Sequence, residues 1–336
     1  MENNWEGKYG PLLIAEIGGN HEGDFEYAKK LTQLAIDSKA DFVKYQLYSG
    51  DTLVSQLESP VRNKHFKKFE LAKEQHIELA KMCQEANVGY MASVWDEEMM
   101  HWIDPYMPIY KIGSGDMTAY PILKIIAKKG KPIILSTGVS TLKEIIESVH
   151  YIQSVNPIYK DSNFLSILQC TSMYPIEFKD ANLGVMDEIK KATGLTVGYS
   201  DHTIGMKALE ISVAMGAQIL EFHFTDTREG KEFRDHKVSL TKEEVHALIS
   251  KLEDINTLKG NGNKRPLEVE GEHRTSFRRA IYPLKDLKAG TVFSEEYFTT
   301  LRPNHGIDAR EFENMLGKTL KVDIKQHQRL EFEMFD

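Results

Sequence analysis

Short apolar runs alternate along this chain with longer segments whose apolar residues recur at three- and four-residue steps. Each run is β-branched or apolar and is followed by a polar or glycine-bearing turn, a pattern typical of buried strands. The longer segments have the periodicity of amphipathic helices. The eight runs cover residues 12–18, 42–48, 88–95, 108–114, 132–138, 164–171, 196–202 and 219–225.

This alternation of strand and helix implies parallel pairing with right-handed crossovers. Eight such units over about 250 residues match the size of an α/β fold of the (β/α)8 TIM-barrel type. A doubly wound open sheet is the alternative, because periodicity alone does not show closure. In a barrel, we expect the apolar N-terminal halves of the strands to fill the interior.

The pattern changes after the eighth unit. Residues 241–258 have the periodicity of a last barrel helix, and the stretch that follows them is rich in glycine and charge. The remaining segment carries short strand-like runs without the barrel's alternation. We therefore predict a catalytic barrel over residues 1–258, a linker over 259–276 and a small domain over 277–336.

Composition and charge limit the possible partners. The chain has 42 Lys and Arg against 50 Asp and Glu, a net charge of −8, which gives no general attraction to nucleic acid or anionic lipid. An anionic substrate must then be held by local cations. The N-terminal stretch lacks a signal-peptide pattern and no apolar run approaches the roughly 20 residues of a membrane span, so we expect a cytoplasmic protein without a membrane partner. Cys83 and Cys170 are too isolated for a disulfide framework or a thiolate metal site.

Polar side chains gather at or just past the carboxyl ends of the eight runs. In a TIM barrel these ends converge on one mouth, where the active sites of this fold are found. Alternation along a strand places Lys44 with Gln46, and Ser200 with His202, on the same strand face. The full set is Glu16, Lys44, Gln46, Ser93, Lys111, Ser114, Ser136, Ser172, Tyr174, Ser200, His202, Glu221 and His223.

Lys44 and Lys111 stand inside otherwise apolar runs, where an unpaired ammonium is costly to bury. Each alone could be a salt-bridged or snorkelling lysine. Two of them at one mouth favour instead an anion cradle for phosphate and carboxylate groups. The serines expected to surround them are Ser93, Ser114, Ser136 and Ser200.

His202 and His223 end neighbouring strands and could meet at one ion. A lone histidine is more often a hydrogen-bonded core residue, but the pair, with Glu16 and Asp235 nearby, favours a divalent metal. Two imidazoles and few carboxylates suit Mn²⁺ or another first-row ion, with Mg²⁺ as an alternative. Coordination positions would remain open for water and substrate.

Ser200, Asp201 and His202 also have the residue types of a hydrolytic triad. Adjacent strand residues point to opposite faces, so the serine cannot present its oxygen to a histidine held by the intervening aspartate. The chain has no G-x-S-x-G elbow elsewhere. The sequence therefore argues against a serine hydrolase.

Taken in order, the motifs IAEIGGNHEGD, ADFVKYQLY, YKIGSGD, ILSTG, CTSMYP, GYSDHT and EFHFTD strongly resemble the sialic acid synthase family. These enzymes condense phosphoenolpyruvate with an N-acetylated hexose. The C-terminal segment is similar to the small antifreeze-like (SAF) domain, a β-clip fold, that the family appends to its barrel. The resemblance covers nearly the whole chain.

The resemblance implies a metal-dependent condensation with Mn²⁺, or with Mg²⁺ or Co²⁺ in its place. The methylene carbon of phosphoenolpyruvate attacks the aldehyde of an open-chain sugar, water adds at the neighbouring carbon, and phosphate leaves. We expect N-acetylmannosamine as the acceptor and N-acetylneuraminate as the product. The alternative is a diamino hexose, giving legionaminate or a related acid; pseudaminate is less favoured, because such relatives tend to carry a different motif in place of EIGGNHEG.

The resemblance also implies a role for each site residue. Glu16 and Asp116 would be catalytic, and His202 and His223 would bind the metal. In the family, the SAF domain of one subunit caps its partner's barrel, so a swapped homodimer is expected, with an arginine on the sugar's N-acetyl group. The residues expected to bind phosphoenolpyruvate are Lys44, Ser93, Lys111, Ser114, Ser136, Ser172 and Ser200, and those expected to bind the sugar are Gln46, Tyr174, Asp235 and Arg302.

Four departures from the family pattern fall mainly at the sugar end. Asp116 replaces a glutamate found in many relatives, and Ser172 replaces an asparagine found in some. The family's RPGxG turn, which begins here at Arg302, reads RPNHG. Phe233-Arg234 replaces the glycine-proline that usually precedes Asp235. Because the phosphoenolpyruvate and metal residues are kept while the sugar contacts vary, the pattern indicates an altered acceptor.

Two other hypotheses remain open at this stage. A condensation of the eight-carbon Kdo type would need an extra cationic pocket for the acceptor's phosphate and no SAF segment. A non-catalytic sugar-binding barrel would have no reason to keep two lysines, two histidines and a buried glutamate at the mouth.

Overall fold

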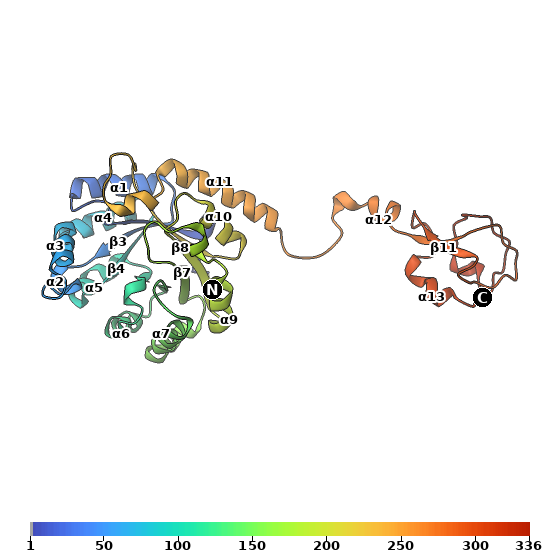
Figure 1. The fold of residues 1–336 in the computed structure, drawn as a ribbon, viewed down its shortest axis with the longest axis horizontal. Coiled ribbons are helices and arrows are strands. Elements are labelled where there is room, and N and C mark those ends of the chain that lie inside the picture. Colours follow the sequence, from blue (N-terminus) through green and yellow to red (C-terminus); the bar gives the residue numbers. More distant parts are fainter. Residues whose placement is uncertain (1–2) are drawn as a thin grey trace. The chain divides into compact units, whose positions relative to one another are not determined.

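Eight parallel strands close into a barrel in the computed structural model, which describes residues 3–336 (Figure 1). Each strand pairs with the next, and the last pairs back onto the first, with Leu12 opposite Ile219. Closure confirms the TIM barrel and rules out the open sheet. The strands are β2 (Gly10–Gly18), β3 (Phe42–Leu47), β4 (Gly89–Val94), β5 (Tyr110–Ile112), β6 (Ile133–Ser136), β7 (Leu165–Cys170), β8 (Thr196–Asp201) and β9 (Ile219–His223).

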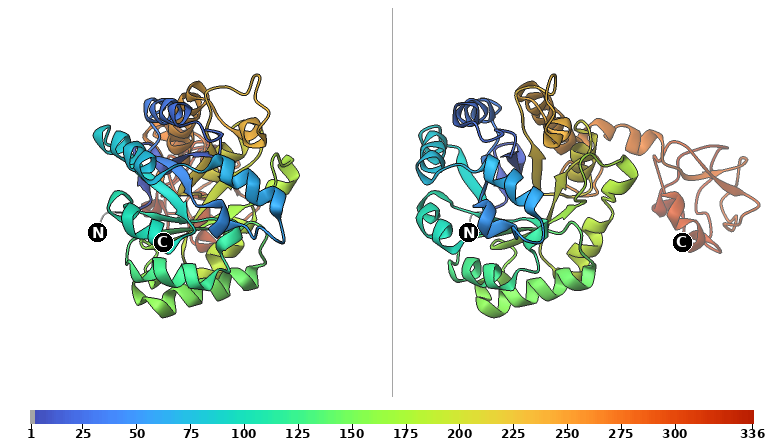
Figure 2. Two further views of the ribbon diagram at one scale, coloured as in Figure 1. Left: turned by 90° about the vertical axis from the view of Figure 1, so that its left-hand side faces the viewer. Right: turned by 60° about the vertical axis from the view of Figure 1, so that its left-hand side comes forward.

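Helices surround the strands as an outer ring in the views of Figures 1 and 2. Two of their starts follow from the sequence: Thr141 and Thr241 each form a capping box with the glutamate three residues later, which satisfies amide groups that the first turn leaves unpaired. The main helices are α1 (Phe25–Asp37), α4 (Lys73–Glu85), α5 (Glu97–Ile103), α6 (Tyr120–Lys128), α7 (Leu142–Val155), α9 (Val185–Thr193), α10 (Lys207–Ala214) and α11 (Lys242–Lys259).

Several short elements were not expected from the sequence. Strand β1 (Glu6–Gly7) pairs antiparallel with β2, and two helices, α2 (Gly50–Leu53) and α3 (Pro60–Phe69), precede α4. Asn63 fixes this pair, because its buried amide donates to the carbonyls of Gly50 and Val54. The other short helical segments are η1 (Asp104–Tyr106), η2 (Ser114–Asp116), η3 (Pro157–Lys160), α8 (Phe178–Ala181) and η4 (Arg234–Val238).

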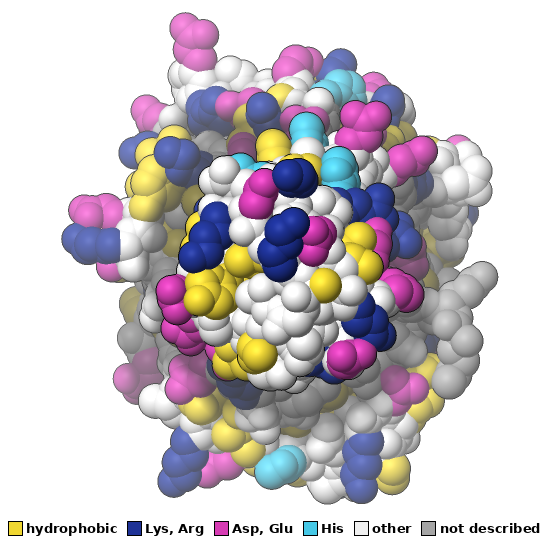
Figure 3. Space-filling view, turned by 90° about the vertical axis from the view of Figure 1, so that its right-hand side faces the viewer, with side chains coloured by type: hydrophobic (Ala, Val, Ile, Leu, Met, Phe, Trp, Pro, Cys, Tyr) yellow, Lys and Arg dark blue, Asp and Glu magenta, His cyan; other side chains and the backbone are white. Residues whose placement is uncertain are grey.

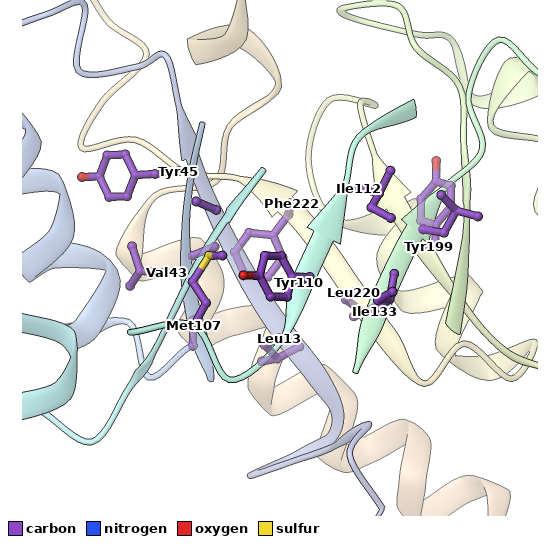
Figure 4. Close-up of a cluster of buried hydrophobic side chains, with 14 of the residues drawn as sticks. Leu13, Val43, Tyr45, Met107, Tyr110, Ile112, Ile133, Tyr199, Leu220 and Phe222 are labelled. Carbon is purple, nitrogen blue, oxygen red and sulfur yellow. The ribbon is translucent and has the colours of Figure 1, made fainter. Parts of the chain in front are cut away.

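Two apolar layers share the barrel strands. The inward layer fills the barrel with Ile14, Phe42, Met91, Ile134 and Leu168 among others, which confirms that the N-terminal parts of the strands make the interior core. The outward layer packs the strands against the helices, and Figure 4 shows part of it. Alternation explains this division, since successive strand residues face opposite sides. The inward positions above the apolar layer are left for polar groups.

The chain divides into two compact units, Met1–Gly260 and Asn261–Asp336. The second has its own core, which includes Ile281, Phe293, Phe298, Met315 and Phe335. Its strands β10 (Ala280–Pro283) and β11 (Phe298–Leu301) pair antiparallel. Its helical segments are η5 (Glu268–Glu270), α12 (His273–Ser276), η6 (Ala309–Glu311), α13 (Phe312–Met315) and η7 (Phe332–Met334).

Two further features concern the described residues. Within residues 3–336, no helix is both long and apolar enough to cross a membrane. The face seen in Figure 3 carries Lys and Arg side chains beside Asp and Glu side chains. The mixture of signs on that face fits the modest net charge of −8.

Candidate active site

A pocket of about 640 Å³ lies at the carboxyl ends of the barrel strands. We call it the mouth pocket. The structure brings together in its lining nearly all the side chains that the sequence predicts for the site. These are Glu16, Lys44, Gln46, Ser93, Lys111, Ser114, Asp116, Ser136, Ser172, Tyr174, Ser200, His202 and His223.

Strand register sets a ring of alternating charges at the bottom of this pocket. Glu16 on β2 stands opposite Lys44 on β3, and the Lys44 Nζ lies 2.5 Å from Glu16 Oε2. On the other side, Glu221 Oε2 is 3.9 Å from Lys44 Nζ, and Glu221 Oε1 is 3.3 Å from Lys111 Nζ. All four side chains are buried. The ring therefore pairs two ammonium groups with two carboxylates.

The electrostatics of this ring follow from burial and pairing together. Burial raises the pKa of Glu16 above its usual value despite the nearby Lys44. Burial alone would also raise the pKa of Glu221, but Lys111 and Lys44 outweigh it and lower that pKa to about 2. Burial lowers the pKa of Lys111, whereas on Lys44 the two carboxylates outweigh burial and the pKa is raised. Glu16 is thus the carboxyl group of the ring that takes up a proton most readily.

Serine hydroxyls and one glycine shape the wall beside the lysines. The Gly138 amide donates to Ser114 Oγ over 3.0 Å. A Cβ atom at Gly138 would lie 2.1 Å from Ser172 Oγ, so only glycine allows these serines to converge. Ser200 Oγ donates to Glu221 Oε1 over 3.0 Å, while the buried Ser136 hydroxyl has no partner among residues 3–336. An unpaired buried hydroxyl in a pocket wall is suited to a ligand.

His202 and His223 lie with their ring centroids 5.3 Å apart. The Nδ1 atom of His202 is 2.7 Å from the carbonyl oxygen of Thr171. Because a carbonyl only accepts, Nδ1 carries the proton and Nε2 keeps its lone pair, the tautomer of many metal-ligating histidines. His223 is buried, with Nδ1 unpaired within the described residues, and burial holds its pKa well below the usual value. Both imidazoles therefore offer nitrogen lone pairs.

The carboxylates that the sequence placed near these histidines are engaged elsewhere. Glu16 accepts from Lys44 and from Gln46 Nε2, the latter over 3.0 Å, and Asp235 accepts from Arg234 Nε over 3.0 Å. In the part of the chain that the structure describes, no three His, Cys, Asp or Glu side chains form a group that could hold a metal. Two imidazoles that each offer a nitrogen lone pair fit a divalent ion whose other coordination positions are filled by water and substrate.

Asp116 has a partner that sequence reasoning missed. The indole Nε1 of Trp95, at the end of β4, donates to Asp116 Oδ2. Burial raises the pKa of Asp116, while the Trp95 hydrogen bond and the charge of Lys111 oppose that rise. The shorter side chain of aspartate is thus held in place by an aromatic donor from the neighbouring strand.

The sugar residues predicted from the sequence fall in different places. Gln46 and Tyr174 line the mouth pocket, and Asp235 lines a second pocket that adjoins it. The Tyr174 ring lies 4.0 Å from that of His202, and the guanidinium carbon of Arg234 lies 4.6 Å from the Tyr174 ring centroid. Arg302 belongs to the C-terminal unit, where its guanidinium carbon lies 5.6 Å from the Phe277 ring centroid.

The stretch Ser200-Asp201-His202 shows the strand alternation that excluded a triad. Ser200 and His202 line the mouth pocket. Asp201 is buried away from it and accepts hydrogen bonds from Tyr199 Oη and from the amide and hydroxyl groups of Thr203. Its role is to fix the turn that follows β8.

Several other pocket residues were given no role from the sequence, among them Glu221, Arg62, Trp95 and Arg234. Glu221 was noted only as a polar strand end, although its position beside two buried lysines is a usable signal. Arg62 comes from the unexpected helix α3. Trp95 and Arg234 line the pocket from the ends of β4 and of the loop after β9. A cation or an indole outside the periodic segments gives no signal, so nothing in the sequence marked Arg62 or Trp95, and Arg234 was noted only as part of a departure from the family pattern.

Comparison with known families gives two matches that together span most of the chain. Residues 31–264 match the NeuB family, and residues 278–336 match the SAF domain. The first match covers the barrel and the second covers most of the C-terminal unit.

Individual proteins similar to this chain include synthases of nonulosonic acids. The chain is 36% identical to the N,N'-diacetyllegionaminic acid synthase of Campylobacter jejuni, over 94% of this chain and 97% of that protein. It is 34% identical to the enzyme of that name from Legionella pneumophila, over 93% of this chain and 91% of that protein. Among solved structures, N-acetylneuraminic acid synthetase from Leptospira borgpetersenii, in complex with citrate, matches with a TM-score of 0.71 and 28% identity, covering 78% of this chain and 89% of that one.

Proposed function

This chain belongs to the NeuB family, and from that membership we propose that it condenses phosphoenolpyruvate with an open-chain diacetamido hexose to form a diacetyllegionaminate-type nonulosonic acid. The observation that carries the proposal is the mouth pocket, in which buried lysines, serines and two histidines meet at the carboxyl ends of the strands. N-acetylmannosamine was the acceptor expected from the sequence. The diacetyllegionaminic acid synthases among its relatives favour the alternative acceptor.

The reaction joins three reactants and releases phosphate. The methylene carbon of phosphoenolpyruvate forms a bond to the aldehyde carbon of the sugar, and the aldehyde oxygen takes a proton to become a hydroxyl. Water adds to the carbon that bears the phosphate and gives up its protons as the carbon–oxygen bond to phosphate breaks. The product keeps the whole carbon chain of the hexose, so every N-acetyl group of the product comes from the acceptor.

Lys44, Lys111 and the serines of the pocket wall would hold phosphoenolpyruvate. Its phosphate and carboxylate carry several negative charges, and Lys44 and Lys111 are buried cations within the same pocket. Binding adds negative charge next to Glu16, whose pKa burial already raises. Glu16 then becomes a group able to hold and return a proton during the reaction. Asp116, fixed by Trp95, is the second candidate for proton transfer or for orienting the water.

His202 and His223 would hold the divalent ion, with Mn²⁺ the expected metal. When bound, such an ion polarises a carbonyl oxygen and lowers the pKa of a coordinated water. The chain's own contribution is to keep His202 in one tautomer through Thr171 and to shield His223 from competing protons by burial. Tyr174 packs against both rings and restricts their rotation.

The proposal is tested by phosphate release from phosphoenolpyruvate labelled with ¹⁸O at the bridging carbon–oxygen–phosphorus position. The full chain is incubated with Mn²⁺, labelled phosphoenolpyruvate and either the diacetamido hexose or N-acetylmannosamine. We expect release that depends on acceptor and metal, with the label in the phosphate. Label retained in the keto acid would contradict the carbon–oxygen cleavage. Absence of release with every acceptor would favour the non-catalytic barrel.

A further inference from the structure

A second pocket, of about 570 Å³, adjoins the mouth pocket and has a different character. Its floor is made by three rings, which we call the aromatic shelf: His65 and Phe69 from α3, and Phe233 from the loop after β9. The ring centroids of His65 and Phe69 lie 4.4 Å apart, those of Phe69 and Phe233 lie 5.0 Å apart, and those of His65 and Phe233 lie 5.9 Å apart. The shelf is therefore one continuous aromatic surface, apolar at its two phenylalanine rings.

Gly19 allows the shelf to form. A Cβ atom at this position would lie 3.2 Å from the Phe233 ring and 3.3 Å from the Phe69 ring, closer than most such contacts. Phe69 is buried and Phe233 is half-buried, so the shelf has a packed side and a side that faces the pocket. The pocket lining also includes Tyr48 and Phe66, whose rings meet edge to face with centroids 5.2 Å apart.

Polar groups lie where the aromatic shelf's pocket meets the mouth pocket. Gln46, Arg62, Phe66, Tyr174 and Arg234 line both pockets, so the two spaces are continuous. A sugar whose aldehyde end is near His202 and His223, beside Tyr174, would extend its far end into the second pocket. Its polar groups would meet the amide and guanidinium groups, and an apolar substituent would meet the rings.

We propose that the aromatic shelf is a specificity-determining element that receives the methyl group of the acceptor's second acetamido substituent. This inference rests on the proposed function, because it takes the part of the mouth pocket beside Tyr174 as the acceptor site. A methyl group on aromatic faces removes apolar surface from water, whereas a hydroxyl over Phe69 and Phe233 would lose its hydrogen bonds to water without gaining partners on those rings. The shelf would thus favour a diacetamido hexose over N-acetylmannosamine.

The test compares the two acceptors on the full chain with Mn²⁺ and saturating phosphoenolpyruvate. The variant Phe233→Ala removes the half-buried ring of the shelf, and we expect the ratio of kcat/KM for the diacetamido hexose to kcat/KM for N-acetylmannosamine to fall about tenfold. The variant Phe233→Leu keeps apolar volume and should lower that ratio about threefold. Phe178→Ala removes an exposed phenylalanine on α8, outside both pockets, and serves as the matched control.

The outcomes separate this inference from the function on which it rests. An unchanged acceptor ratio in a folded Phe233→Ala protein, or in Phe233→Leu if the alanine variant does not fold, would overturn the shelf while leaving the condensation intact. An equal loss with both acceptors would also overturn it. If the unmodified chain released no phosphate with either sugar, the proposed function itself would fail. Thermal unfolding of each variant identifies those that fold.

Discussion

Lys44 and Lys111 are each paired with a carboxylate before any substrate is present, through Glu16 and Glu221. Buried ammonium groups without partners would be costly, so this pairing explains how the two lysines remain in the barrel. An entering phosphoenolpyruvate must compete with those carboxylates. The competition is eased at Glu16, because burial raises the pKa of this residue and favours its uptake of a proton.

His202→Ala tests the proposed metal site. The change removes one of two imidazoles while leaving the packed strands unaltered, so we expect Mn²⁺ affinity, measured by electron paramagnetic resonance titration, to fall by at least about tenfold. Metal-dependent phosphate release should be lost and the circular dichroism spectrum should stay the same. His101→Ala, an exposed histidine on α5, is the control. Metal-dependent turnover retained by His202→Ala would contradict the assignment.

Trp95→Phe tests the partner of Asp116. Burial raises the pKa of Asp116 and the indole hydrogen bond opposes the rise, so removing the indole donor should raise that pKa further. If ionised Asp116 takes part, the acid limb of the kcat/KM profile moves to higher pH. Trp102→Phe, on α5 outside the mouth pocket, is the control. A profile that coincides with that of the unmodified chain would remove Asp116 from the rate-determining proton transfers.

At the scale of elements, the eight strands follow from residue pattern alone, because buried parallel strands need continuous apolar runs bounded by turns. The runs FVKYQLY and TVGYSDH coincide with β3 and β8 to within one residue. Helix α3 could not be predicted in this way. Its sequence, PVRNKHFKKF, has little apolar content, and its position depends on the Asn63 side chain, whose partners lie 9 and 13 residues away.

This difference decides how much of the site could be found from the sequence. Side chains at strand ends, such as Lys44 and His223, are placed by the barrel itself and were predicted. Arg62 and Phe66 were missed because they depend on α3, and Phe233 was recognised only as a departure from the family pattern. The sequence showed that the sugar end varies, but the aromatic shelf needed tertiary contacts between α3 and the loop after β9.

A buried histidine between α4 and β4 is expected to make the stability of the barrel depend on pH. His76 on α4 is buried, its Nδ1 lies 3.0 Å from Tyr90 Oη, and burial, aided by the charge of His21, lowers its pKa to about 3. The unfolded chain binds a proton at a pKa near 6.5 while the folded chain does not. The contribution of His76 to stability is therefore present above pH 6.5 and declines as pH falls from there toward 3.

Between pH 7 and pH 5, the titration of His76 should lower the free energy of unfolding by about 2 kcal/mol. Urea unfolding at the two pH values measures the loss. In His76→Gln the loss should shrink by about that amount, whereas His150→Gln, at an exposed position on α7, should behave like the unmodified chain. An equal loss in His76→Gln would show that His76 does not supply the acid sensitivity.

At the scale of the whole molecule, the chain consists of a barrel unit and a C-terminal unit, each with its own apolar core. All predicted site residues except Asp235 and Arg302 line the mouth pocket, Asp235 lines the adjoining pocket, and Arg302 belongs to the other unit. We propose that the active unit is a homodimer in which the SAF domain of one subunit caps the barrel of its partner. Neither subunit alone would then hold a complete acceptor site.

Subunit complementation tests this arrangement. Lys111→Met disables the phosphoenolpyruvate site, and Arg302→Ala should raise the KM for the acceptor while leaving that for phosphoenolpyruvate unchanged. After the two variants exchange subunits, half of the dimers are mixed, and each mixed dimer has one intact barrel capped by an intact SAF domain. Activity should return to about one quarter of the unmodified level. No recovery after demonstrated exchange would place the arginine on its own subunit's barrel.

The central claim is that this barrel joins phosphoenolpyruvate to a diacetamido hexose. The most direct measurement is a competition in one reaction mixture, with the full chain, Mn²⁺, limiting phosphoenolpyruvate and equal concentrations of the diacetamido hexose and N-acetylmannosamine, followed by mass spectrometry of the acidic sugar products. We predict that the diacetyl nonulosonic acid predominates and that total product equals phosphate released. Predominance of N-acetylneuraminate, or absence of both products, would contradict the claim.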